Sequence, residues 1–142
     1  MLVWQQANVF MNGCIIADNY ATGSNAVHVR HPGSSLTIDN CQFLRNAAAI
    51  HSGALSASMG ASLYVSDSKF IENHAPGHGA MNVQSAHAEV TGCLFLRNDG
   101  GLVGALALEM SNGFVTGNTF HANSGSSGTV RLYDYTLFSR TS

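Results

Sequence analysis

The stretch NCQFLRN at residues 40–46 returns almost unchanged as GCLFLRN at residues 92–98. When the chain is aligned with itself, the six-residue core of this stretch recurs with starts 27, 27, 25 and 25 residues apart. The third residue of each copy is Ile or Phe and the sixth is always Asn, although only 12 of the 142 residues are Asn. Such a register indicates a true internal repeat. The five copies are CIIADN from Cys14, CQFLRN from Cys41, SKFIEN from Ser68, CLFLRN from Cys93 and NTFHAN from Asn118.

Two further blocks accompany every copy of this hexapeptide. One precedes it, as in SLTIDN at 35–40, and one follows it, as in SGALSA at 52–57. All three blocks alternate apolar and polar residues, which is the pattern of a β-strand, and no apolar period of 3.6 residues persists long enough for a helix. Each repeat unit of about 25 residues therefore carries three short predicted strands.

The junctions between the blocks carry the residues that best tolerate a left-handed backbone, namely Gly, Asn and Asp. We therefore expect a corner at the same places in every unit. Three strands and fixed corners predict an all-β fold, a right-handed parallel β-helix of about five coils, with residues 1–142 as a single domain. The expected corners are Gly13, Asn40, Asp67, Gly92 and Gly117 before the hexapeptide, and Asn25, Gly53, Gly79, Gly104 and Gly128 before the third strand.

In a parallel β-helix, equivalent positions stack about 4.8 Å apart. Phe43, Phe70, Phe95 and Phe120 should form an internal aromatic ladder capped by Ile16, and burial of each ring should contribute on the order of 1.5–3 kcal/mol. The Asn of each copy should bond to its own turn and to the next Asn, so that removing one should cost roughly 1–3 kcal/mol.

The FxxN element, paired with a GA-aliphatic element, resembles the repeats of the chlamydial polymorphic outer membrane proteins. The matching stretches are FLRN, FIEN, FLRN and FHAN, with SGAL, HGAM and VGAL, within residues 8–133. The doubled Gly of that family is single here, and the first and last units read NAV and GTV. The resemblance implies a surface-displayed, adhesin-like module, and an extracellular or cell-surface location.

Composition limits the possible partners. Charged residues make up 10% of the chain, with one Lys and five Arg, so no basic patch for nucleic acid is expected. No apolar run reaches the length of a transmembrane helix, and the opening residues lack the basic region of a signal peptide.

The outward rows of the predicted strands allow a test for chemistry. No two carboxylates become neighbours on one face, whereas a glycosidase needs a carboxylate pair and a calcium site needs clustered oxygen ligands. We therefore expect no enzyme and assign no catalytic, cofactor-binding or metal-binding residue; a polysaccharide-active enzyme like pectate lyase stays an alternative. The rows on the third strand are His28, Ser56, Asn82, Ala107, Arg131 and Arg30, Ser58, Gln84, Glu109, Tyr133. The rows on the first strand are Phe10, Thr37, Tyr64, Glu89, Phe114 and Asn12, Asp39, Ser66, Thr91, Thr116.

Histidines and cysteines are the other candidates. His51, His74 and His78 lie in expected turns on neighbouring coils, where they either converge on a transition metal or simply belong to polar turns; we favour polar turns. His28, His31, His87 and His121 are expected in turns or at the surface. Cys14, Cys41 and Cys93 share an inward position, and Cys14 and Cys41 lie close enough on adjacent coils for a disulfide, although buried free thiols are the simpler interpretation.

Two surfaces point to binding. Leu44, Ile71 and Leu96 form an apolar column that either faces outward or folds inward, and Phe10, Tyr64 and Phe114 share an external row. The end segments, residues 1–7 and 134–142, do not resemble polar caps, so we expect a fragment of a longer solenoid or a subunit with covered ends. Together these features predict a non-catalytic scaffold or adhesin-like module that binds protein chains or surface glycans. A docked subunit of a large complex and an ice-binding solenoid are alternatives; Asp39 and Asn12 interrupt the Ser/Thr column that ice binding would need.

Overall fold

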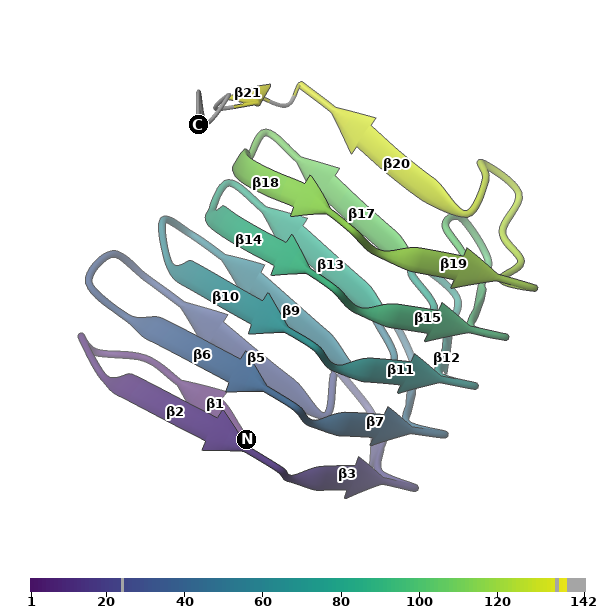
Figure 1. Ribbon diagram of the computed structural model, residues 1–142, viewed down its shortest axis with the longest axis horizontal. Coiled ribbons are helices and arrows are strands. Elements are labelled where there is room, and N and C mark those ends of the chain that lie inside the picture. Colours follow the sequence, from purple (N-terminus) through teal and green to yellow (C-terminus); the bar gives the residue numbers. More distant parts are fainter. Residues whose placement is uncertain (24, 135, 138–142) are drawn as a thin grey trace.

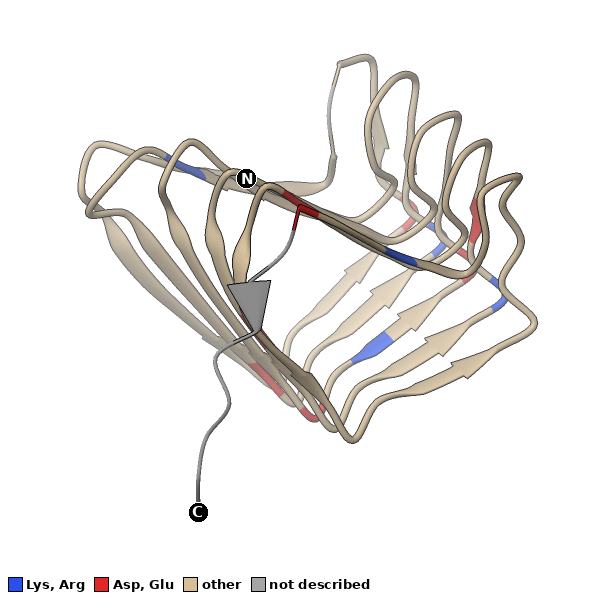
Figure 2. Ribbon diagram, turned by 90° about the horizontal axis from the view of Figure 1, so that it is seen from above, with Lys and Arg blue, Asp and Glu red and all other residues tan. Residues whose placement is uncertain are grey.

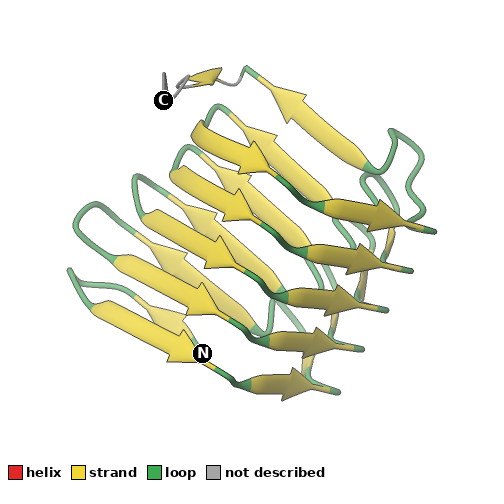
Figure 3. Cartoon of the chain, in the orientation of Figure 1, coloured by secondary structure: helices red, strands yellow, loops and turns green. Residues whose placement is uncertain are grey.

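The computed structural model describes residues 1–23, 25–134 and 136–137, and in these residues it contains strands and turns but no helix. Every strand pairs in parallel with its equivalent one coil away, so the chain winds as a solenoid (Figures 1 and 3). The prediction of a right-handed parallel β-helix of about five coils is confirmed.

The strands stack into four parallel sheets. Sheet A contains β1 (Leu2–Val3), β5 (Val27–Arg30), β9 (Leu55–Ser58), β13 (Met81–Gln84), β17 (Leu106–Glu109) and β20 (Val130–Tyr133). Sheet B contains β2 (Asn8–Asn12), β6 (Ser35–Asp39), β10 (Ser62–Ser66), β14 (His87–Thr91), β18 (Asn112–Thr116) and β21 (Thr136–Leu137). Sheet C contains β3 (Ile15–Ala17), β7 (Gln42–Leu44), β11 (Lys69–Ile71), β15 (Leu94–Leu96) and β19 (Thr119–His121). Sheet D contains β4 (Tyr20–Ala21), β8 (Ala47–Ala48), β12 (His74–Ala75) and β16 (Asp99–Gly100).

Sheets A, B and C form the three long sides of the coil, as the view along the solenoid shows (Figure 2). Three strands per coil were expected, and they correspond to these three sheets. The structure adds the two-residue strands of sheet D, which directly follow the Asn column. They are too short to show a period of two, so alternation could not reveal them.

The Phe ladder is present as predicted. The rings of Phe43, Phe70, Phe95 and Phe120 stack with centroid separations of 4.8, 4.9 and 4.9 Å and interplanar angles between 7° and 13°. Ile16 is in register with Phe43 and continues the column. The first three rings are fully buried, and their spacing is that of the strands themselves.

The corner before each copy of the hexapeptide is left-handed in all five coils, with φ between +46° and +65° at Gly13, Asn40, Asp67, Gly92 and Gly117. The expected left-handed corner before sheet A is wrong for Gly53, Gly79 and Gly104, which do not have a positive φ, whereas Gly128 does. Gly is needed in that place for a different reason: a Cβ on Gly79, for example, would collide with the carbonyl oxygen of Gly104 in the next coil.

Two further left-handed corners lie where the residue type did not indicate them. One falls on the fifth residue of each hexapeptide, and the other directly follows the sheet A strands β5, β9, β13, β17 and β20. Side chains there cost more than Gly would, yet the stacked coils impose the same backbone on every repeat. The first set is Asp18, Arg45, Glu72, Arg97 and Ala122, and the second is His31, Met59, Ser85, Met110 and Asp134.

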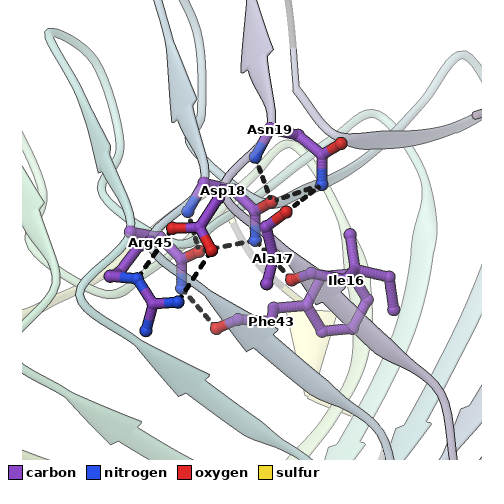
Figure 4. A network of polar contacts seen from close by, with 8 residues as sticks. Ile16, Ala17, Asp18, Asn19, Phe43 and Arg45 are labelled. Carbon is purple, nitrogen blue, oxygen red and sulfur yellow. Dashed lines mark hydrogen bonds and ion pairs between the residues drawn. The ribbon is translucent and has the colours of Figure 1, made fainter.

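The Asn column runs along the corner between sheets C and D. The Nδ2 of Asn46 donates to the Oδ1 of Asn73 at 3.0 Å and to the carbonyl oxygen of Ile16 at 2.8 Å. Each internal Asn thus bonds to its neighbours in the column and to backbone of the preceding coil, rather than mainly to its own turn as expected. Figure 4 shows the start of this column at Asn19, beside the Arg45–Asp18 ion pair, whose N–O distance is 2.7 Å.

Val, Leu, Ile, Ala and Phe side chains from sheets A, B and C fill one continuous core inside the coil. Leu36, Leu63 and Leu106 are among the side chains with no exposed surface. Within the described part of the chain, no helix is long and apolar enough to cross a membrane.

Candidate functional site

The outer face of sheet A carries two rows of side chains, in the registers expected from the sequence. His28 lies beside Ser56, which lies beside Asn82 and then Ala107 and Arg131. The second row places Gln84 beside Ser58 and beside Glu109. Since alternate residues such as Val27 and Val29 belong to the core, these rows face away from it.

Turns that precede sheet A form a wall beside this face. In Figure 2 they project past the edge of sheet A on its outer side. The turns bond to one another along the solenoid: the N–H of His78 donates to the carbonyl oxygen of His51 at 2.7 Å, and that of Leu102 donates to Gly77 at 2.9 Å. Gly77 permits this close approach, because a Cβ there would meet the carbonyl oxygen of His51.

The floor and the wall enclose a pocket of about 340 Å³ over β5, β9 and β13, which we call the corner pocket. Among the described residues that line it, none is a carboxylate, Lys or Arg. It therefore offers hydroxyl, amide and imidazole groups together with one thioether. The lining residues are Asn25, His28, His51, Ser56, Ala57, Ser58, Met59, Asn82, Gln84 and Ser85.

His78 belongs to the turn between β12 and β13, and its ring approaches Glu109 of β17 in the next coil. It is 7% exposed, its Nε2 lies 3.9 Å from the Oε1 of Glu109, and Arg131 approaches the same oxygen to 3.8 Å. Burial lowers the pKa of His78 below its ordinary value of 6.5, although Glu109 opposes the shift. Burial also lowers the pKa of His28, with help from the positive charge of Arg30. Both imidazoles are therefore neutral at pH 7.

Among the described residues, four buried side-chain atoms have no hydrogen bond. They are the Nε of Arg30, both ring nitrogens of His78 and the Oδ1 of Asn82. Asn82 is 9% exposed and Ala107 is fully buried, although neither belongs to the core inside the coil. We expected the whole outward row to be exposed. This is wrong for Asn82 and Ala107, which are buried on the outer face of sheet A.

The family comparison agrees with this architecture. The family model described as "Right handed beta helix region" matches residues 1–105. The chain belongs to the right-handed β-helix family. Comparison with curated proteins gave no match, and comparison with solved structures gave none either.

The histidines of this β-helix do not behave alike. His51 is exposed and lines the pocket, and His74 is exposed on β12, where its Nδ1 lies 3.2 Å from the Oδ2 of Asp99. His78 lies in the turn between β12 and β13, as expected, but its side chain is buried there. No group of three or more His, Cys, Asp or Glu with the geometry of a metal site occurs among the described residues.

The remaining histidines each have different surroundings. The Nε2 of His28 lies 2.9 Å from the Oγ of Ser58, and the Nδ1 of His87 lies 2.6 Å from the Oδ1 of Asn112 on the outer face of sheet B. His31 forms one of the left-handed corners, and His121 is exposed.

The cysteine column is structural. Cys14, Cys41 and Cys93 are free thiols. The Sγ of Cys41 donates to the carbonyl oxygen of Asp39, and the hydroxyl of Ser68 repeats this bond with Ser66 in the next coil. Burial raises the pKa of Cys93 to about 11. A thiol so protonated is a poor nucleophile at neutral pH.

The other outer faces of the β-helix carry exposed apolar residues. Phe10 and Ile15 are each 66% exposed, and Tyr64 is 36% exposed. Leu44, Ile71 and Leu96 are half-buried, an outcome between the two that the sequence left open. In the Ser/Thr column of sheet B, Asp39 interrupts as expected and accepts hydrogen bonds from Asn12 and Ser66.

Sequence reasoning identified the residues on the pocket floor but not the pocket. The wall depends on how far the turns project, and alternation carries no signal for that. The paired glycines in PGHGA at 76–80 and GGLVGA at 100–105 are the one sequence feature that marks closely stacked turns.

Proposed function

We propose that this protein is a non-catalytic binding β-helix, an adhesin-like surface module that holds its ligand in the corner pocket. The observation that carries the proposal is the pocket itself. It spans three neighbouring coils, and no carboxylate, Lys or Arg occurs among the lining residues that the structure describes. A concave site with a few convergent polar groups is the usual form of a binding site.

The chemistry of the same face supports binding over catalysis. Glu109 is the one carboxylate in the two outer rows of sheet A, and Arg131 and His78 both approach it. Glycoside hydrolysis by acid–base catalysis requires two carboxylates at a defined separation. A nucleophilic role for Cys93 is disfavoured by its burial and raised pKa.

The repeat motifs support the adhesin-like part of the proposal. FLRN, FIEN and FHAN with the GA-aliphatic blocks resemble the chlamydial polymorphic outer membrane proteins, which are surface-displayed and linked to adhesion. The ligand would then be a component of a cell surface, either a protein chain or a glycan.

The proposal can be tested by blocking the pocket. Ser58→Trp should fill it from the floor, whereas Thr37→Trp places the same side chain on the outer face of sheet B. The full chain should bind to immobilised cell-surface extracts, Ser58→Trp should lose at least tenfold in affinity, and Thr37→Trp should bind like the wild type. Equal binding by all three proteins would refute the proposal.

The same preparations should be incubated with a panel of neutral and acidic polysaccharides. We expect no release of new reducing ends and no unsaturated product by the wild type. Turnover that Ser58→Trp abolishes would replace the binding role with an enzymatic one, of the kind that pectate lyases perform on a β-helix.

A docked structural subunit is the second candidate, and the exposed Phe10 and Ile15 on sheets B and C favour it. Exposed apolar side chains on a face with few charges mark interaction surfaces. Sedimentation of the purified chain separates the candidates. A soluble monomer supports the surface module, and an aggregate that Phe10→Ser with Ile15→Ser disperses supports the subunit.

A further inference from the structure

The outer face of sheet C carries an apolar strip. Phe43 and Phe70 belong to the core, so the residues on either side of them in β7 and β11 point away from it. Ile15 on this face is 66% exposed, and its apolar neighbours are half-buried. In the fifth coil the same positions carry Thr119 and His121, so the strip is confined to the first four coils. Its apolar members are Ile15, Ala17, Leu44, Ile71, Leu94 and Leu96.

A ladder of charged side chains runs along one edge of this strip, at the left-handed corner after sheet C. The Nε and Nη2 of Arg45 donate to the two carboxylate oxygens of Asp18, each at 2.7 Å (Figure 4). Two coils further along, the Nη2 of Arg97 lies 2.9 Å from the Oε1 of Glu72. All four side chains are at least 41% exposed, so each keeps a side open to solvent. Along the solenoid the charges of this ladder alternate from negative to positive twice, and Ala122 ends it in the fifth coil.

The charge pattern of the ladder is complementary to its own reverse. A second copy, turned about a two-fold axis parallel to the strands, runs antiparallel and presents the charges in the opposite order. Asp18 would then face the partner's Arg97, and Arg45 would face the partner's Glu72. A shift by one coil would place Arg45 against the partner's Arg45, and like charges oppose association. The charges therefore select the antiparallel direction and the register in which the first coil lies opposite the fourth.

The apolar strip fits the same register. Leu44 of the second coil would lie opposite the partner's Ile71 of the third, at the centre of the face. The exposed Ile15 would meet the partner's Leu94. Lys69 interrupts the strip, and in this register its ammonium group would lie opposite an uncharged amide of the second coil. Exposed apolar side chains gathered on one face mark an interaction surface, and this one has its centre where the ladder has its own.

We propose that two copies of this chain associate face to face through sheet C, antiparallel, with the apolar strip at the centre and the two charge ladders along one edge. Such a pair closes on itself, so it is discrete and distinct from the aggregate expected of a docked subunit. The corner pocket lies over sheet A, on another side of the coil (Figure 2), and stays open in the pair. The inference therefore goes beyond the proposed function and does not depend on it.

The test is sedimentation equilibrium of the full chain and of two charge-swap variants with unchanged net charge. Asp18→Arg with Arg45→Asp keeps this ion pair within the chain but places like charges opposite each other at all four positions of the dimer. It should raise the Kd of the dimer by about tenfold or more. Arg45→Glu with Glu72→Arg breaks both ion pairs within the chain but keeps opposite charges across the dimer. It should dimerise with a Kd within about threefold of the wild type. Circular dichroism checks that both variants are folded.

A second pair of variants tests the apolar strip and does not depend on the folding of the swap variants. Ile71→Glu places a carboxylate at the centre of the strip and should raise the dimer Kd by about tenfold or more. Phe10→Glu, on the outer face of sheet B, is the matched control and should dimerise as the wild type does. Because the ladder is exposed, a higher salt concentration should also weaken the dimer.

The outcomes separate a dimer interface from a ladder that acts only within each chain. A monomer at every concentration, or an open aggregate, would overturn the inference. So would a dimer that Asp18→Arg with Arg45→Asp or Ile71→Glu leaves unchanged. If folded Arg45→Glu with Glu72→Arg is monomeric, the ladder serves the single chain and the inference falls. None of these results bears on binding in the corner pocket, which Ser58→Trp tests separately.

Discussion

Asn73→Ala should destabilise the protein far more than a single polar substitution usually does. The side chain of Asn73 is fully buried and makes four hydrogen bonds. Its Nδ2 donates to the carbonyl oxygen of Phe43 at 3.0 Å and to the Oδ1 of Asn98 at 2.9 Å. Its Oδ1 accepts from the backbone N–H and the Nδ2 of Asn46, both at 3.0 Å.

The expected magnitude follows from these bonds. A neutral hydrogen bond contributes about 1 kcal/mol net, so the loss of four should cost about 4 kcal/mol. The partner groups left behind are buried and cannot bond to water instead. The destabilisation should therefore be at least this large. For a chain of this size, each kcal/mol lowers Tm by about 3 °C, so a shift of about 12 °C is expected.

Asn19→Ala is the matched control, because it makes the same substitution in the same column. Asn19 is exposed and its side chain makes only two bonds, to Ala17 at 3.1 Å and to Asn46 at 2.9 Å. The Oδ1 of Asn46 still accepts from the backbone N–H of residue 19 after the substitution, so we expect a loss of about 1 kcal/mol.

Urea denaturation followed by circular dichroism measures both variants, and equal m-values would show that the same surface is exposed on unfolding. If Asn73→Ala costs no more than Asn19→Ala, the column does not stabilise the coils through its buried bonds. The stabilising role that we assign to the Asn repeated at the sixth position of each hexapeptide would then be wrong.

Three further perturbations test the fold and the pocket. Phe70→Ala should lower the free energy of unfolding by about 3–5 kcal/mol, because its ring stacks at 4.8 and 4.9 Å on two neighbours. Phe120→Ala removes a ring with one ring neighbour and should cost less. Equal losses in urea denaturation would contradict the ladder. Gly79→Ala should destabilise the fold by about 3 kcal/mol or more, because the added Cβ collides with backbone. At Gly13 the Cβ has open space, so Gly13→Ala has only the positive φ to overcome, at about 1 kcal/mol. Thermal unfolding should show the larger loss of Tm for Gly79→Ala. Because the folded pKa of His78 lies below its ordinary 6.5, its contribution to stability is complete above about pH 6.5 and falls as the pH drops through the folded value. His78→Gln should therefore flatten the decline of Tm below pH 6.5, and an unchanged slope would show that His78 is not held neutral.

The fold was predictable because each coil repeats the same physical problem. Phe43, Phe70 and Phe95 must be buried, and in a solenoid the only way to bury them in register is to stack them. The left-handed corners at Gly13 and Asn40 were predictable for the same reason, since their residue types match the backbone required.

The corners at Arg45 and Glu72 could not be predicted, because tertiary stacking imposes a positive φ on residues that do not favour it. The glycines before sheet A led to the opposite error, because they suggested left-handed corners that the structure does not have there. Gly53 and Gly79 are needed for the space between coils, and their φ values are ordinary. One residue type served two physical requirements, and sequence reasoning saw only one of them.

For this protein, local alternation and the spacing of Phe and Asn were enough to determine the parallel β-helix and the register of every row, because both depend on short-range pattern repeated along the chain. The corner pocket was decided only in three dimensions. It exists because turns from separate coils bond to one another and rise beside sheet A, which buries His78 and Asn82 on a face that alternation alone assigns to solvent.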